Sequence, residues 1–384
     1  MKSEFKNLPS GWRVVKLEKV APLQRGYDLP TDNIKEGLYP VVYSNGILRF
    51  HNEFKAKAPG VITGRSGTIG KVVYVEEDYW PHNTSLWVTN FYDNNPKFIY
   101  YMYINLNLVR FSAGSGVPTL NRNDIHAQTI PLPPLDEQEK IAEILSTWDE
   151  AINLTINLIE NKKRFKKALM QILLTAKIRF PEFKDEWKET KLGKCLKEKS
   201  DRNTKNIDLV LSVTNKFGFV TQVEYFDKSV ASDNTANYKI VKNGNFAYNP
   251  SRINVGSIAL LESYEIGILS PMYVVFECLK NSDNRFLKFW FQSHNFIGNL
   301  YKYLAGSVRE SLNFKDMKTI SIKLPNLNEQ QKIAEVLAAC DDEINLLNLK
   351  LENLKKQKQG LMQKLLSGNI RTKVKGGKNV KMDD

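Results

Sequence analysis

The feature that most constrains this chain is an internal repeat. The run DEQEKIAEIL at 136–145 recurs at 328–337 as NEQQKIAEVL, an offset of 192 residues. The same offset relates Asp149 to Asp341, 169–171 to 361–363 and, upstream, 113–115 to 305–307. Because self-similarity at a fixed offset is the mark of duplicated structural units, we expect two similar halves.

The two halves have similar ends but dissimilar middles. The opening at 12–17 resembles 187–192 at a shorter offset, so the second half is longer in its middle. Short β-branched, Gly-punctuated runs at 37–50, 60–90, 206–224 and 238–278 are typical of strands joined by tight turns. Aromatic-rich helical stretches follow at about 96–112 and 283–304. The pattern predicts a common scaffold that presents two different surfaces.

Each repeat ends in an apolar pattern with a period of 3.5 residues, which is typical of a coiled coil. Pro133, Pro134 and Pro325 end the preceding chain, and we expect Asp136 and Asn328 to cap the helices. At about 1.5 Å per residue each helix would be roughly 55–60 Å long. The predicted seams are Ile141, Leu145, Trp148, Ile152, Ile159, Leu169 and Leu173, and Ile333, Leu337, Cys340, Ile344, Leu347, Leu351, Leu354, Leu361 and Leu365.

The repeat symmetry favours pairing of these two helices with each other, antiparallel, over two amphipathic helices packed in separate cores. Lys166 and Lys358 occupy the same seam position in the two helices. A polar seam residue is a common device for fixing the register of a coiled coil. We therefore expect these two lysines to set the alignment of the helices.

The net charge of +13 is carried by two segments, 161–188 and 350–384, and the rest of the chain is balanced. Basic clusters of this kind suit a polyanion such as DNA. A solvated helix face followed by a basic tail explains the charge equally well, so the charge alone does not decide between the two interpretations.

No catalytic centre or metal site is predicted. The segment 64–71 resembles a phosphate-binding loop, but its spacing is wrong and Val72 stands where a Ser or Thr would hold magnesium. The run 248–251 resembles an adenine-methyltransferase motif without its second proline and its aromatic residue. The four His and three Cys are scattered, without metal-ligand spacing or a CxxC pair.

The composition favours a cytoplasmic protein. No apolar run approaches the roughly 18 residues that a membrane span needs. The start, MKSEFK, has no apolar stretch behind it, so we expect no secretory signal. An odd number of scattered cysteines fits a reducing compartment.

Several repeated motifs together resemble one known family. They are PLPPLDEQEKIA at 131–142 with its second copy at 322–334, the endings at 169–174 and 360–368, and the openings at 9–12 and 180–184. They cover nearly the whole chain, twice and in the same order. The chain resembles the specificity subunit of type I restriction-modification systems.

The resemblance implies an α+β fold. Two pseudo-twofold-related globular target-recognition domains would each be followed by a long helix, and the two helices would pair as an antiparallel coiled coil. We place target-recognition domain 1 at 1–134, the central spacer helix at 135–178 and target-recognition domain 2 at 179–325. The distal spacer helix is placed at 326–370 and a basic tail at 371–384.

The resemblance also implies the function. Each recognition domain would read one half of a bipartite, asymmetric double-stranded DNA site, and the helices would set the separation of the half-sites. The chain would have no enzyme activity or cofactor of its own. It would recruit two methylation subunits, which bind S-adenosylmethionine, and restriction subunits that use ATP and Mg²⁺.

Candidate DNA-binding residues are turn residues whose side chains can pair with groove edges, such as Arg with guanine and Asn with adenine. Arg and Lys near the repeated Gly-Ser stretch are expected to bind phosphates instead. The base-reading candidates are Tyr43, Ser44, Asn45, Arg65, Ser66, Lys71, His82, Asn83, Tyr248, Asn249, Ser251, Arg252 and Asn254, and the phosphate-binding candidates are Arg122, Arg309 and Lys315.

The repeated helix starts are candidate partner-binding surfaces, because two copies of one surface would suit two copies of one partner. The residues are Glu137, Gln138, Ile141, Glu329, Gln330 and Ile333. Packing of each helix start on its own globule is the alternative explanation of the repetition, and we favour partner binding over it.

Two other functions are compatible with parts of the sequence. A coiled-coil scaffold or adaptor would bind any duplex, with a steep salt dependence and no sequence preference. A stand-alone DNA-modifying enzyme would need the cofactor loop and catalytic motif that the sequence lacks.

Overall fold

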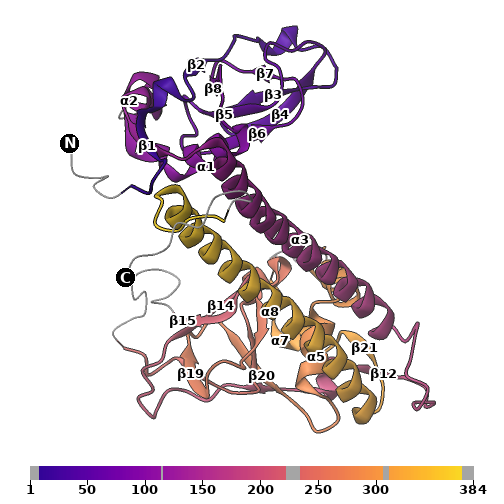
Figure 1. Ribbon diagram of the computed structural model, residues 1–384. Coiled ribbons are helices and arrows are strands. Elements are labelled where there is room, and N and C mark those ends of the chain that lie inside the picture. Colours follow the sequence, from indigo (N-terminus) through magenta and orange to yellow (C-terminus); the bar gives the residue numbers. More distant parts are fainter. Residues whose placement is uncertain (1–7, 114–115, 222–233, 306–310, 374–384) are drawn as a thin grey trace. The chain divides into compact units, whose positions relative to one another are not determined.

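The computed structural model describes residues 8–113, 116–221, 234–305 and 311–373 (Figure 1). The chain divides into two compact units, Met1–Ile156 with Leu349–Asp384, and Asn157–Asn348. Each unit therefore contains one globule and a part of each long helix. This division cuts through both helices, whereas the sequence-based boundaries treated each helix as a separate segment.

The globule of the first unit is built on a four-stranded sheet of order β2-β8-β5-β6. A second sheet of order β4-β3-β7 contains the β3–β4 hairpin, and β3 runs parallel to β7. Strand β1 pairs with β11 and β9 with β10. The bounds are β1 Arg13–Lys16, β2 Leu23–Arg25, β3 Tyr39–Tyr43, β4 Gly46–His51, β5 Gly60–Gly64, β6 Val72–Val75, β7 Trp80–Pro81, β8 Ser85–Val88, α1 Pro96–Asn105, β9 Ser112–Ala113, β10 Thr119–Leu120, α2 Arg122–His126 and β11 Thr129–Leu132.

The second unit repeats this plan. Its four-stranded sheet has the order β13-β20-β17-β18, β14 and β15 form a hairpin, β16 pairs with β19, and β12 pairs with β21. The bounds are β12 Lys188–Lys191, β13 Leu196–Lys199, β14 Leu211–Thr214, β15 Gly218–Thr221, β16 Lys239–Lys242, β17 Phe246–Tyr248, β18 Ile258–Leu260, β19 Ile266–Leu269, β20 Val274–Cys278, α5 Asn284–Phe291, α6 His294–Ala305, α7 Phe314–Met317 and β21 Ser321–Leu324.

The long helices are α3, Leu135–Leu173, and α8, Leu327–Leu366. Both start one residue before the predicted caps. Asn326, rather than Asn328, accepts the backbone N–H of Glu329 at 3.0 Å and caps α8. The helices also end a few residues before the predicted 178 and 370, where Ala176 and Gly368 have positive φ angles of 57° and 79°.

The helices pack antiparallel within each unit. In the first unit Ile141 and Leu145, near the start of α3, share a core with Met362 and Leu365, near the end of α8. In the second unit the end of α3, at Leu173, shares a core with the start of α8. All predicted seam residues are buried or half-buried, so the predicted pairing is confirmed.

The two seam lysines form equivalent ion pairs. Lys358 Nζ lies 2.5 Å from Asp149 Oδ1 in the first unit, and Lys166 Nζ lies 2.6 Å from Asp341 Oδ1 in the second. Each ammonium group also lies about 5 Å from an aromatic ring, 5.1 Å from that of Tyr101 and 5.0 Å from that of Phe289. Because a shifted register would leave these half-buried charges unpaired, the lysines fix the alignment as expected.

A second equivalent pair joins each helix start to the chain that follows the other helix. Glu137 is 2% exposed, and its carboxylate accepts two bonds of 2.9 Å from the Arg371 guanidinium and one of 2.9 Å from Trp12 Nε1. Glu329, 1% exposed, accepts bonds of 2.9 and 2.8 Å from Arg179. Arg371, which the sequence-based boundaries place at the start of the basic tail, is thus a structural residue. Residues 374–384 lie outside the described residues.

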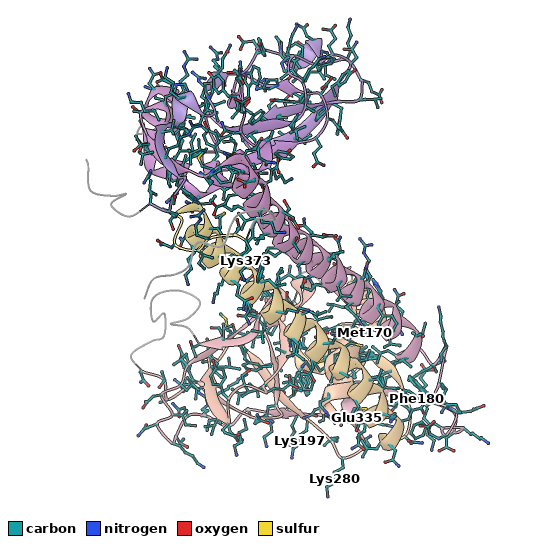
Figure 2. The ribbon with its side chains drawn as sticks, in the orientation of Figure 1. Met170, Phe180, Lys197, Lys280, Glu335 and Lys373 are labelled. Carbon is teal, nitrogen blue, oxygen red and sulfur yellow. The ribbon has the colours of Figure 1, made fainter. Side chains whose placement is uncertain are left out.

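We expect Arg371→Ala to lower the free energy of unfolding by about 2 kcal/mol, because it leaves the buried Glu137 carboxylate without its cation. Urea denaturation followed by tryptophan fluorescence would measure the change. Lys373→Ala is the matched control, since Lys373 is an exposed cation two residues further on (Figure 2). Equal unfolding midpoints for the two variants would contradict the structural role of Arg371.

Candidate nucleic-acid interface

Three loops of the first unit meet at one end of its sheets. They are the β3–β4 turn, the β5–β6 loop and the turn between β7 and β8. Lys71 Nζ donates to the Asn45 carbonyl at 2.6 Å, and Arg65 Nη1 donates to the Asn83 carbonyl at 3.4 Å. The backbone N–H groups of Arg65 and Ser66 both donate to the Thr84 carbonyl, at 2.8 and 3.1 Å.

His82 connects the turns of this cluster. Its ring lies 4.2 Å from the Tyr43 ring, centroid to centroid. The Ser44 N–H donates to Thr84 Oγ1 at 3.3 Å, and Thr84 Oγ1 lies 2.9 Å from His82 Nδ1. Since Thr84 N–H also points at Nδ1, at 3.3 Å, this nitrogen acts as an acceptor and the ring is neutral. Burial lowers the pKa of His82, and the Leu29 backbone and Asp28 oppose this shift more weakly.

The structure therefore brings together all eight base-reading candidates of the first unit, none of them fully buried. They offer Arg, Lys, Asn and Ser groups on one surface, which we call the first reading cluster: Tyr43, Ser44, Asn45, Arg65, Ser66, Lys71, His82 and Asn83. Arg122, exposed at the start of α2, follows Leu120, whose N–H donates to the Arg65 carbonyl at 2.8 Å.

In the second unit the corresponding segment is the turn after β17. The Leu312 N–H donates to the Pro250 carbonyl at 3.1 Å, as Leu120 does to Arg65 in the first unit. Ser251 and Arg252 are exposed and Asn254 is half-buried on the short helical segment Pro250–Val255. Lys315 is exposed on α7, and Arg309 lies outside the described residues.

Two candidates of the second unit have structural roles. Tyr248 is fully buried in the core and burial raises the pKa of its hydroxyl, so the prediction that it reads bases is wrong. Asn249 caps the segment that follows, its side chain accepting the Ser251 N–H at 3.1 Å. Tyr248 was misjudged because a strand residue next to a turn can point either way, and its burial depends on residues distant in sequence.

Sequence reasoning missed the β14–β15 turn. Strand β3 runs parallel to β7, and Val210, directly before β14, forms a parallel bridge to Ile268 of β19, so the β3–β4 and β14–β15 hairpins are equivalent. Asn215, Lys216 and Phe217, all exposed in this turn, therefore correspond to Ser44 and Asn45. The available signal was a polar Asn-Lys pair between two apolar runs, followed by Gly218.

The structure contradicts the predicted partner contacts. Glu137, Gln138 and Ile141, and their repeats Glu329, Gln330 and Ile333, are at most 2% exposed. Gln138 accepts the Asn95 N–H at 3.0 Å and donates to the Pro133 carbonyl at 3.0 Å. Gln330 accepts the Asp283 N–H at 2.9 Å. The repeated residues thus hold each helix start to its own globule, which is the alternative that the sequence had left open.

Part of the basic run on α3 is neutralised within the second unit. Lys162 pairs with Glu343 at 2.7 Å and Lys163 with Glu160 at 2.8 Å, in addition to the Lys166 pair. Arg164 and Lys167 are exposed. Three lysines of this run therefore form ion pairs on the two helices, and Arg164 and Lys167 are the exposed residues of the run that could bind a polyanion.

No group of three or more His, Cys, Asp and Glu side chains within the described ranges could hold a metal ion. Among the helices that the structure describes, none is long and apolar enough to cross a bilayer.

The sequence matches the family described as type I restriction modification DNA specificity domain, over residues 9–163 and again over 186–356. The chain belongs to this family. The MjaVIII specificity subunit of Methanocaldococcus jannaschii is 28% identical over 283 residues, which span 68% of this chain and 66% of that relative. The putative MjaX specificity subunit of the same organism is 27% identical over 346 residues, 80% of this chain and 76% of the relative.

The fold agrees with this assignment. The crystal structure of the S subunit of a type I restriction-modification system from M. genitalium superposes with a TM-score of 0.60 at 16% identity, covering 94% of this chain and 97% of that one. The chain is accordingly the DNA specificity subunit of a type I restriction-modification system, which is a non-catalytic subunit.

His82 connects the turns of the first reading cluster through Thr84, and this connection requires the neutral form of the His82 ring. Because the folded state holds the pKa of His82 below its unfolded value of about 6.5, its contribution to stability is present above pH 6.5 and is lost as the pH falls below it. An NMR titration, with His82→Gln to assign the resonance, should give a pKa below 6.5. A pKa above 6.5 would contradict the neutral state of the His82 ring.

Proposed function

We propose that this subunit directs methylation and restriction to a bipartite, asymmetric double-stranded DNA site, each globule reading one half-site. The main support is that equivalent exposed loops occur on equivalent sheets and hairpins of the two units. The loops differ in chemistry: the first reading cluster is rich in polar and basic groups, whereas the second unit presents Ser251, Arg252 and the β14–β15 turn. Different side chains on a shared scaffold suit two different half-sites.

Phosphate contacts are proposed for Arg122, Arg309 and Lys315, which would set the position of each globule without reading bases. Helices α3 and α8, of 39 and 40 residues, are proposed as the spacer that fixes the separation of the half-sites. The aligned Lys–Asp pairs support this role, because a spacer can define a distance only if its register is fixed.

The proposed partners are two methylation subunits and, in the full complex, restriction subunits. S-adenosylmethionine, ATP and Mg²⁺ would be bound by these partners and not by this chain. The complex would act in the cytoplasm, where the duplex DNA that it reads is located.

The outer faces of the long helices are better candidates for binding the methylation subunits than the buried residues rejected above. Leu154 on α3 and its repeat Leu346 on α8 are 61% and 66% exposed. Exposed acidic residues precede both leucines, one and three turns earlier on the same face: Glu143 and Glu150 on α3, and Glu335 (labelled in Figure 2) and Asp342 on α8. Each unit therefore presents one copy of the same surface, which fits two copies of one partner.

We expect Leu154→Lys to reduce the number of bound methylation subunits from two to one, and Leu154→Lys with Leu346→Lys to abolish binding, because each leucine would anchor one subunit. Native mass spectrometry of the purified complex would count the subunits. Ile156→Lys is the matched control: Ile156 is 39% exposed on α3, but it lies two residues from Leu154 and so faces another side of the helix, and its repeat position holds Asn348. Two bound subunits in the double variant would contradict this surface.

The function itself is tested by a genome-wide map of methylated adenine, with the chain co-expressed with the methylation subunit of its own system and a control lacking only this chain. The expected result is a new split motif with two different half-sites and a fixed gap. Replacing residues 1–134 with the corresponding domain of another specificity subunit should change one half-site alone. No new motif from an active methylation subunit, or an unchanged motif after the replacement, would contradict the proposal.

A further inference from the structure

Three segments of the second unit are in contact: the β14–β15 hairpin, the 249–257 segment and the turn before β20. Ser257 Oγ donates to the Val213 carbonyl at 3.0 Å, which ties the end of the 249–257 segment to β14. The Val213 N–H donates to Tyr273 Oη at 3.5 Å, which brings in the turn before β20. Asn249 Nδ2 lies 3.8 Å from Met272 Sδ, so the 249–257 segment and this turn are also in contact.

Each of these segments presents one large apolar side chain to solvent. Phe217, Val255 and Met272 are 59%, 56% and 61% exposed. We call these three residues the apolar tip. Exposed apolar side chains drawn from three separate loops onto one surface are typical of a binding site, because each of them would be more stable when covered.

The charge around the apolar tip indicates the class of ligand. Lys216 Nζ lies 4.9 Å from the centre of the Phe217 ring, and Arg252 is exposed between Asn249 and Val255. Asn215 and Ser251 add exposed groups that can hydrogen-bond. A cationic, hydrogen-bonding rim around apolar side chains fits a polyanion that also presents methyl groups, which describes the major groove of DNA at thymine.

The equivalent turn of the first unit differs. Ser44 and Asn45 stand where the second unit has Asn215, Lys216 and Phe217, and Lys71 Nζ covers the Asn45 carbonyl at 2.6 Å. The first reading cluster is therefore suited to hydrogen-bond recognition, whereas the second unit adds apolar contact. The two surfaces would distinguish bases by different physical means.

We propose that Phe217, Val255 and Met272 read the C5-methyl groups of thymine in the half-site of the second unit, with Lys216 binding the adjacent phosphate backbone and Arg252 a neighbouring base. This inference rests on the proposed function. It names a determinant of sequence specificity: the second half-site contains at least one A·T pair that is recognised through its methyl group.

The experiment uses the complex of this chain with its methylation subunits and a duplex carrying the mapped motif. Each thymine is replaced in turn by uracil, which pairs identically but lacks the methyl group. Uracil at a contacted position should weaken binding about fourfold, the value of one buried methyl-sized group. In Phe217→Ala and Met272→Ala complexes the same replacement should have a smaller effect, since the side chain that covers the methyl group is gone.

Ile178→Ala is the matched control, because Ile178 is 58% exposed in the same unit but lies in the connection after α3. It should retain the full uracil effect. A split motif whose every thymine tolerates uracil, or variants that keep the full effect, would overturn the inference and leave the proposed function intact. Loss of assembly with the methylation subunits in Phe217→Ala would also overturn it, by assigning the apolar tip to a protein contact. Absence of any split motif would instead refute the proposed function.

Discussion

The buried carboxylates of Glu137 and Glu329 constrain the rest of the fold. A charged group that is at most 2% exposed must have a cation and hydrogen-bond donors, or its burial would cost several kcal/mol. In each unit the cation is an arginine from the chain that follows the other long helix, Arg371 or Arg179. The start of one helix is thereby tied to the end of the other, which permits only antiparallel packing. The seam pairs of Lys166 and Lys358 then set the register that this packing leaves open.

The scaffold was predictable because its information is local and occurs twice. Apolar periodicity located both long helices, and the repeat showed that they are equivalent. The partners of charged groups were not predictable: Lys166 and Asp341 are 175 residues apart, and Lys358 and Asp149 are 209 apart. Arg371 was assigned to a tail for the same reason, since only the folded chain places it against Glu137. The sequence shows that a polar residue lies on the seam of one helix. Which residue of the other helix lies opposite depends on the path of the chain between the two helices.

The candidate interface was predictable in the first unit and only in part in the second. In the first unit each turn is marked by Gly or Asn between apolar runs, and the expected residues around Ser44, Arg65 and His82 do converge. In the second unit the extra residues in the middle removed the alignment that would have matched the β14–β15 turn to its equivalent. Residues next to a turn in the sequence were therefore assumed to be exposed, and this assumption was wrong for Tyr248, whose ring lies in the core.

Repetition within one chain separates two kinds of residue. Residues that recur in both units, such as Glu137 and Gln138 with their copies, are mostly buried, because both globules meet the same helix pair in the same way. This is why repetition was a misleading sign of a partner surface, and why an exposed repeated residue such as Leu154 carries more weight than a buried one. Residues that differ between the units at equivalent exposed turns have no shared packing role to explain them. A subunit that reads two unlike half-sites would require this difference. On this view the exposed turns determine which bases are read, and the long helices determine the distance between the half-sites.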